Sequence, residues 1–267
     1  VIWHEAPFAV GANLKAALES LKAGKFDEFE AMVALFQKTS QRLKYSLVPT
    51  VAAVEGMALG GGCEFVMHSQ RVVAALESYI GLVEVGVGLL PAGGGLKELA
   101  QRANAWAKGG DAFPELGRLF RQVAMADVSK SAEHARELGY LRPADVVVFH
   151  PAELLHVAKQ QARAMVESGH RPPLAPTRIP VAGSTGIATL KMMLVNMKEG
   201  GFISDHDYEI GSRIATVLCG GEVEPGSLVD EQWLLDLERH HFLELAKTAK
   251  TQDRIEHMLK TGKPLRN

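Results

Sequence analysis

Apolar residues are concentrated in a short run, residues 50–54, between Pro49 and Gly56. An apolar run bounded by Pro and Gly predicts a buried β-strand. Glycines follow at 60–62, and residues 63–68 then contain no helix breaker, which predicts a buried helix. Glycines between a strand and a helix let the backbone approach a ligand closely, with free amides at the helix N-terminus. This stretch therefore predicts a site for an anion, or for an oxygen that becomes anionic.

The rest of the chain alternates between predicted strands and helices and then becomes helical. Strand, helix and strand in this order predict repeated βαβ units with right-handed crossovers, and hence an α/β fold. Residues 1–13 are expected to contain the end of a strand followed by a loop, and 91–95 to open a helix. Further strands are expected at 71–75 and 146–149, and helices at 26–44, 114–126, 131–138, 153–168, 187–198, 205–218 and 231–250.

Prolines mark a boundary between the α/β part and the helical part. Four prolines between positions 172 and 180 make residues 171–182 the segment most typical of a linker. We therefore expect an α/β core over residues 1–170 and a helical region over 183–267.

The helix expected at 26–44 has a predicted cap and a predicted buried face. Asp27 is in place to cap its N-terminus, with Glu30 three residues later. A stripe at helical spacing predicts core side chains. Its members are Phe29, Met32, Val33, Phe36 and Leu43.

Two glutamates stand in apolar surroundings close to the glycine-rich stretch. Glu64 follows the glycines, and Glu84 lies between Val83 and Val85. An apolar environment disfavours the charged form and raises a carboxyl pKa, which suits general acid–base chemistry near neutral pH. The spacing alone leaves a second interpretation open, in which the glycines only form a tight connection and both glutamates face solvent.

Composition limits the classes of protein to be considered. Hydrophobic residues make up 47% and charged residues 22%, which is ordinary for a globular protein. A formal net charge of −2 gives no reason to expect nucleic acid or an anionic membrane as the main partner. Cys63 and Cys219 are the only cysteines, so no disulfide framework is indicated and a cytoplasmic location is expected. No apolar run has membrane-spanning length.

Several short sequence motifs, in order along the chain, closely resemble the signature of the crotonase (enoyl-CoA hydratase/isomerase) superfamily. They are FAVGANL at 8–14, VPTVAAVEG at 48–56, ALGGGCE at 58–64, Glu84 with GLLPAGG at 88–94, and SKSAEHARELGY at 129–140. The last stretch, RIEHMLKTGKPLRN at 254–267, resembles the tail of bacterial fatty-oxidation proteins that carry 3-hydroxyacyl-CoA dehydrogenase first and a hydratase domain last.

This resemblance implies an α/β, crotonase-like ββα spiral with a helical C-terminal region, in which the family's N-terminal strands are missing. It implies an enoyl-CoA hydratase that adds water syn across trans-2-enoyl-CoA in fatty-acid β-oxidation, as part of a multifunctional 3-hydroxyacyl-CoA dehydrogenase. Two alternatives stay open: an enoyl-CoA isomerase on the same fold, and a truncated, non-catalytic fragment that binds acyl-CoA. An acyl-CoA thioester is the expected small-molecule partner. The chain is further expected to form a homo-oligomer or to dock on a dehydrogenase domain of the same polypeptide.

The resemblance also assigns roles to individual residues. Glu64 and Glu84 match the two catalytic glutamates, and the backbone amides of Ala12 and Gly61 match the oxyanion hole. Having both glutamates favours a hydratase, since related isomerases generally manage with the second carboxylate. The positions implied for substrate binding are Val10, Asn13, Leu14, Met57, Leu59, Gly60, Val83 and Leu89.

Two positions depart from the family pattern without removing a reacting group. Val83 stands where many hydratases have Pro, and Asn13 stands where Asp is common. Both departures leave the acyl-chain length and a secondary isomerase activity open.

No cofactor or metal is expected in this chain. The glycines at 86 and 88 imitate a dinucleotide fingerprint, but Pro91 occupies the third glycine position, so NAD is expected only in a dehydrogenase part outside the chain. Acidic and His residues at 205–207 and 240–244 are explained by a helix cap at Ser204 or Asp205 and by an exposed helix face.

Overall fold

The computed structural model describes residues 1–267 and divides into two compact units. The sheet unit comprises Val1–Ala12, Phe36–Leu82 and Asp127–Ala175, and the helical unit comprises Asn13–Leu35, Val83–Ala126 and Pro176–Asn267. The boundary after Ala175 lies inside the proline-rich segment 171–182. The expected domains, 1–170 and 183–267, are continuous stretches of sequence, whereas each of these units combines three separate segments. The expected domain bounds stay predictions.

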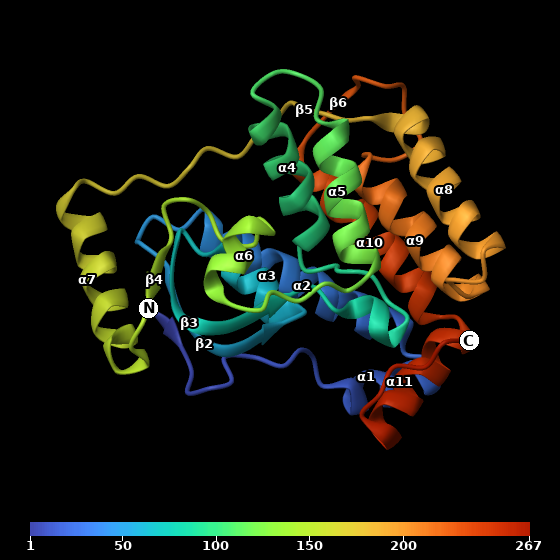
Figure 1. Cartoon of the computed structure of the whole chain (residues 1–267), viewed down its shortest axis with the longest axis horizontal. Coiled ribbons are helices and arrows are strands. Elements are labelled where there is room, and N and C mark those ends of the chain that lie inside the picture. The colour runs from blue at the N-terminus through green and yellow to red at the C-terminus, as the bar shows by residue number, and fades with distance from the viewer. The chain divides into compact units, whose positions relative to one another are not determined.

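The sheet unit is built on a four-stranded parallel sheet in the order β1–β2–β3–β4 (Figure 1). Its strands are β1 (Ile2–Trp3), β2 (Val51–Leu59), β3 (Arg71–Gly81) and β4 (Val146–Val148). Its other elements are α3 (Gly61–His68), α6 (Ala132–Glu137), η2 (Pro151–Glu153) and α7 (Leu154–Glu167), and α2 (Phe26–Lys44) ends in it. The predicted parallel α/β architecture is confirmed.

Strands β2 and β3 are longer than their apolar runs at 50–54 and 71–75 predict. The pairing starts at Val51 with Arg71 and continues to Leu59 with Gly81, across a register shift between Val54 and Gly56. Gly56 has φ 67, a conformation that glycine adopts without strain, so the strand passes through the irregularity and continues. A glycine therefore lies within the strand, although the sequence suggested that it ends the strand.

The core of the sheet unit follows from side-chain alternation along the strands. Residues two apart on a strand point to the same face of a sheet. On β2 and β3 these residues pack with β4 and α7 in one buried cluster: Val51, Ala53, Val73, Ala75, Val148, Leu154 and Ala158.

The helical unit consists mainly of helices, with α8 and α9 packed side by side (Figure 1). Its elements are α1 (Leu14–Lys22), the first part of α2, η1 (Glu84–Val87), α4 (Gly95–Ala107), α5 (Phe113–Ala124), α8 (Gly183–Glu199), α9 (Asp205–Leu218), α10 (Glu231–Ala246) and α11 (Ala249–Thr261). A short antiparallel pair, β5 (Ile179–Pro180) and β6 (Leu228–Val229), completes it.

Two helix boundaries differ from the sequence expectation. The single helix expected at 231–250 is wrong: α10 ends at Ala246, and Thr248 caps α11 by accepting a hydrogen bond from the Thr251 amide. Helix α1 follows the loop expected over residues 1–13 and was not among the expected helices. The Asn13 side chain accepts a hydrogen bond from the Ala16 amide and so starts this helix.

Helix α2 has the predicted bounds, but its cap and one core position differ. It begins at Phe26, so Asp27 lies within the first turn and is not the cap. Phe29 and Val33 are buried as expected, whereas the Met32 side chain is exposed, with 51% of its surface accessible. The expectation that Met32 belongs to the core is therefore wrong, because the buried stripe is narrower than the apolar one.

A buried ionic network lies between α4 and α10 in the helical unit. Lys97 has 0% exposure, and its Nζ lies 2.8 Å from Glu98 Oε1 and 2.7 Å from Glu231 Oε1. Burial lowers the pKa of Lys97, but the attraction of these two carboxylates outweighs burial and holds the pKa above its usual value. Glu238 accepts hydrogen bonds from the amides of Gly94, at 2.9 Å, and Lys97, at 2.6 Å, and so caps α4.

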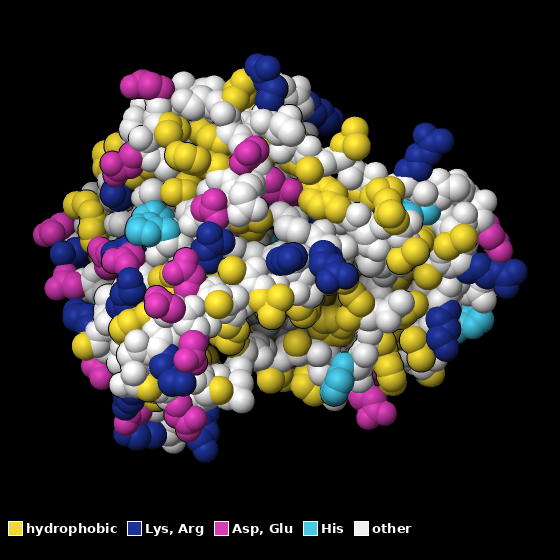
Figure 2. All heavy atoms as spheres, turned by 180° about the vertical axis from the view of Figure 1, so that it is seen from behind, with side chains coloured by type: hydrophobic (Ala, Val, Ile, Leu, Met, Phe, Trp, Pro, Cys, Tyr) yellow, Lys and Arg dark blue, Asp and Glu magenta, His cyan; other side chains and the backbone are white.

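Charges on the surface are mixed. On the face shown in Figure 2, acidic and basic side chains are interspersed rather than gathered by sign. None of the helices is both long and apolar enough to cross a membrane.

Replacing Lys97 by methionine should lower the free energy of unfolding by about 3–5 kcal/mol, because it removes the cation that the buried carboxylates of Glu98 and Glu231 share. Urea denaturation measures the loss. The matched control is Lys159→Met, an exposed lysine on α7, which should change stability by less than about 0.5 kcal/mol. Adding Glu98→Gln and Glu231→Gln to Lys97→Met should recover part of the loss. An equal, small effect of both lysine substitutions would contradict a structural role for the network.

Candidate active site

The glycine-rich stretch forms a tight turn from β2 into α3. Gly60 is the N-cap of α3, with φ 56 and ψ −124, a conformation that favours glycine. Its amide donates to the Gly81 carbonyl at the end of β3, at 2.9 Å. A Cβ atom at Gly62 would lie 2.5 Å from the Ala9 Cβ, so only glycine lets these two segments approach. The glycines thus allow a close approach of the Ala9 segment within the sheet unit, and the approach of a ligand stays a prediction.

The segment that precedes Ala12 is anchored alongside β2. The Ala9 amide donates to the Met57 carbonyl, and the Leu59 amide donates to the Ala9 carbonyl, each at 2.9 Å. Ala12 follows Ala9 by three residues and therefore lies within about 10 Å of it. The backbone amides of Ala12 and Gly61 donate no hydrogen bond within the chain. Two amides near the start of α3 are thus available to an acceptor from outside the chain.

Glu64 lies in the first turn of α3 and is buried, with 3% exposure. Its amide donates to the Gly60 carbonyl at 3.1 Å, and its carbonyl lies 2.7 Å from Nδ1 of His68. The partial positive charge of a helix N-terminus favours a carboxylate at this position. The interpretation in which Glu64 faces solvent is therefore wrong.

Glu84 begins the 3-10 turn η1, directly after the half-buried Val83. The turn is closed by hydrogen bonds from the Gly88 amide to the Val85 carbonyl, at 3.0 Å, and from the Leu89 amide to the Glu84 carbonyl, at 3.1 Å. Glu84 is half-buried. The structure thus describes each glutamate in its own unit, Glu64 in the sheet unit and Glu84 in the helical unit.

The remaining predicted site residues are divided between the two units. Val10, Met57, Leu59 and Gly60 lie in the sheet unit with Ala12 and Gly61, whereas Asn13, Leu14, Val83 and Leu89 lie in the helical unit. Val10 is 61% exposed and Leu89 is buried. Asn13 already serves as the cap of α1 through its side chain. The roles of all these residues in catalysis or binding stay predictions.

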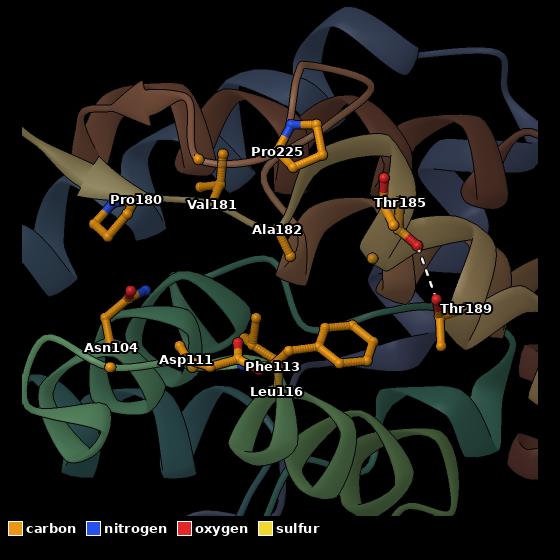
Figure 3. Close-up of a pocket in the computed structure, with 14 residues that line it drawn as sticks. Asn104, Asp111, Phe113, Leu116, Pro180, Val181, Ala182, Thr185, Thr189 and Pro225 are labelled. Carbon is orange, nitrogen blue, oxygen red and sulfur yellow. Dashed lines mark hydrogen bonds between the residues drawn. The ribbon is translucent and has the colours of Figure 1, made fainter.

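A separate open pocket of about 350 Å³ lies in the helical unit (Figure 3). It is lined by Asn104, Gly110, Asp111, Ala112, Phe113, Leu116, Pro180, Val181, Ala182, Thr185, Gly186, Thr189, Pro225 and Gly226. The Thr189 hydroxyl donates to the Thr185 carbonyl at 2.9 Å, and Asp111 Oδ1 accepts from the Phe113 amide at 2.9 Å. None of the predicted site residues lines this pocket.

The helix cap at Ser204, which the sequence analysis favoured over a metal site at residues 205–207, is present. Ser204 and Asp207 form a capping box at the start of α9. The structure contains no group of three or more His, Cys, Asp or Glu side chains arranged to hold a metal ion.

Three comparisons relate the chain to known proteins. Residues 4–107 match the family model described as Enoyl-CoA hydratase/isomerase. A Bacillus subtilis (strain 168) protein named "Probable 3-hydroxyacyl-CoA dehydrogenase" is 44% identical over 260 residues, which cover 97% of this chain and 33% of that protein. The chain thus spans about a third of the length of this relative. The "Crotonyl-CoA hydratase" of Syntrophomonas wolfei is 32% identical over 162 residues, covering 61% of this chain and 55% of the relative.

Solved structures show the fold. The crystal structure of enoyl-CoA hydratase from Bacillus halodurans matches with a TM-score of 0.57 at 16% identity, covering 95% of this chain and 78% of that chain. The predicted crotonase-like α/β fold with a helical C-terminal region is thereby confirmed.

Gly62→Ala should lower the free energy of unfolding by about 1–3 kcal/mol, because its Cβ would overlap the anchored Ala9. The control is Gly117→Ala on α5, where a Cβ meets no atom within 4 Å. That substitution should stabilise by about 0.5–1 kcal/mol, since alanine is the better helix former. Urea denaturation compares the two variants. Equal stability of both would show that the segment at Ala9 does not press on α3.

Proposed function

We propose that this chain adds water syn across the double bond of trans-2-enoyl-CoA thioesters in fatty-acid β-oxidation, because residues 4–107 match the family model described as Enoyl-CoA hydratase/isomerase. The observation that carries the proposal is the turn from β2 into α3. It combines an amide without an acceptor at Gly61 with a buried carboxylate at Glu64, one helical turn apart. A reaction through an enolate needs both an oxyanion donor and an acid–base group.

The amides of Ala12 and Gly61 bind the thioester oxygen in this mechanism. That oxygen gains negative charge as the enolate forms, so donors aimed at it stabilise the transition state more than the ground state. One such donor is worth about 3 kcal/mol. Gly61 is the first residue of α3, and the partial positive charge of the helix N-terminus acts in the same direction.

Glu64 and Glu84 form the proposed acid–base pair. One carboxylate takes a proton from water as the new C–O bond forms, and the π electrons move toward the thioester. The other delivers a proton to the α-carbon, so water is added across the double bond. Support comes from the sheet register, in which Leu59, at the end of β2, pairs with Gly81, at the end of β3. Glu64 and Glu84 each follow one of these strand ends within five residues.

The residues proposed to contact the acyl-CoA substrate are the ones that the family resemblance implies for substrate binding. They are Val10, Asn13, Leu14, Met57, Leu59, Gly60, Val83 and Leu89. Backbone glycines and apolar side chains suit a thioester with an acyl chain, because they allow close approach without adding charge.

We further propose that the chain belongs to a polypeptide with a 3-hydroxyacyl-CoA dehydrogenase. The relative that is 44% identical is named for that activity, and this chain spans only 33% of it. The product of hydration, a 3-hydroxyacyl-CoA, is the substrate of such a dehydrogenase. NAD would then bind in the dehydrogenase part, and this chain would need no cofactor besides the coenzyme A carried by its substrate.

Glu64→Gln and Glu84→Gln should each lower the rate of crotonyl-CoA hydration by about 10²–10⁴-fold, because glutamine neither accepts nor delivers the proton. The loss of the conjugated-thioester absorbance measures the rate, in the full-length protein. Glu77→Gln, an exposed glutamate on β3, is the matched control and should retain the wild-type rate.

Near-normal turnover of both active-site variants would overturn the assignment. A 3-enoyl-CoA substrate separates the isomerase alternative, which would yield 2-enoyl-CoA without requiring Glu64. Acyl-CoA binding without any turnover by the wild type, measured by calorimetry, would identify a binding protein instead.

A further inference from the structure

Helix α11 contacts the backbone of the turn that carries Glu84. The Thr251 hydroxyl donates to the Gly88 carbonyl at 2.7 Å, and Arg254 donates from Nη1 to the Val85 carbonyl at 3.4 Å. Val85 follows Glu84 directly, and Gly88 closes the turn with φ 84. Two side chains of one helix therefore hold both ends of η1, and all these residues belong to the helical unit.

The fit between α11 and the turn is close. A Cβ atom at Gly88 would lie 2.9 Å from Thr251 Oγ1 and 3.1 Å from Cδ of Arg254. Any other residue would push α11 away from η1. Thr251 and Arg254 both have 0% exposure, so neither offers atoms to a substrate. Their effect on a reaction must pass through the turn.

Arg254 is itself held in place by the start of α9. Its Nη1 lies 2.8 Å from Asp207 Oδ1, its Nη2 lies 3.1 Å from Ser204 Oγ, and its Nε lies 2.8 Å from Asn267 Oδ1. Asp207 also pairs with Arg266 at 3.0 Å. A buried guanidinium requires such neutralisation, and these partners fix its planar group relative to α9.

Thr251 is held by a chain of two hydrogen bonds. Its Oγ1 lies 2.9 Å from Nε2 of His206. The hydroxyl has one proton, which goes to the Gly88 carbonyl, so Thr251 accepts from His206 and the Nε2 atom carries a proton. Burial, with Arg254 and Lys250 nearby, lowers the pKa of His206 to about 4, against the opposing effect of Asp207 and Glu209. The imidazole is therefore neutral at neutral pH.

We propose that Thr251 and Arg254 are positioning residues, which orient the Glu84 carboxylate by fixing the backbone of η1 through their hydrogen bonds to its carbonyls. The inference rests on the proposed function of Glu84 as an acid–base group. A glutamate that transfers a proton must stay within hydrogen-bond reach of the reacting atoms, and a misplacement of 1 Å can cost about 10²-fold in rate. Helix α11 thus has a role in the reaction, although Thr251 and Arg254 touch no reacting atom.

Thr251→Val tests the proposal, because it keeps the shape of threonine and removes the hydroxyl. In the full-length protein, kcat for crotonyl-CoA hydration should fall about 10–100-fold. KM should stay within about twofold, and Thr251→Ser should restore most of the rate by returning the hydroxyl. Thr261→Val, an exposed threonine on the same helix, is the control and should leave both constants unchanged.

Amide hydrogen exchange provides a readout that does not depend on activity. The amides of Gly86, Gly88 and Leu89 donate within the turn and should exchange at least about tenfold faster in Thr251→Val than in the wild type. If valine prevents folding, Thr251→Ala removes the same hydroxyl and leaves the space unfilled.

The outcomes distinguish a failure of the positioning role from a failure of the proposed function. Unchanged kcat in Thr251→Val, in an enzyme whose wild type turns over, overturns the positioning role, as does unchanged exchange at the turn. A merely structural role predicts a lower stability with no split between kcat and KM and no rescue by serine. A wild type that does not hydrate crotonyl-CoA defeats the proposed function instead, and the exchange measurement then decides alone whether α11 holds the turn.

Discussion

The parallel pairing of β2 with β3 is the constraint on which the rest of the sheet unit depends. Because Leu59 pairs with Gly81, both strands end at the same edge of the sheet, and the Gly60 amide donates to the Gly81 carbonyl there. Each strand then leads into a segment with a glutamate. In open parallel sheets, the carboxyl ends of the strands are where ligands usually bind. A shift of one residue in this pairing would turn every side chain on a strand to the opposite face and misplace the turn as well.

The chemistry proposed for the chain depends on backbone conformation more than on side chains. Gly60 adopts a positive φ, and Gly62 leaves room for Ala9, so α3 can begin directly beside the segment that leads to Ala12. The two amide donors therefore come from segments far apart in sequence. Backbone conformation also places the carboxylates, since Glu64 lies in the first turn of α3 and Glu84 begins the short turn η1, which α11 contacts. Rigid backbone supports orient flexible side chains at low entropic cost.

The sequence predicts the local part of this structure well and the long-range part poorly. Apolar runs and glycines locate β2, α3 and the glutamates, because burial and positive φ act on neighbouring residues. The break between α10 and α11 depends on one side-chain cap at Thr248, which a helical pattern hides. Met32 has the spacing of a core residue, but only packing decides how wide the buried stripe is. No spacing rule links Thr251 to Gly88, because these residues are 163 positions apart and meet only through the fold.

The ion network between α4 and α10 has a consequence for the order in which the molecule is completed. Lys97 meets Glu231 across 134 positions of sequence, and the α4 cap is supplied by Glu238. During synthesis from the N-terminus, these charges must stay hydrated until the ribosome has delivered α10, because an uncompensated charge is costly to bury. The Lys97 network therefore cannot form before α10 has been synthesised. Contacts of such long range slow folding and prolong exposure of the partly built core to other chains in the cell.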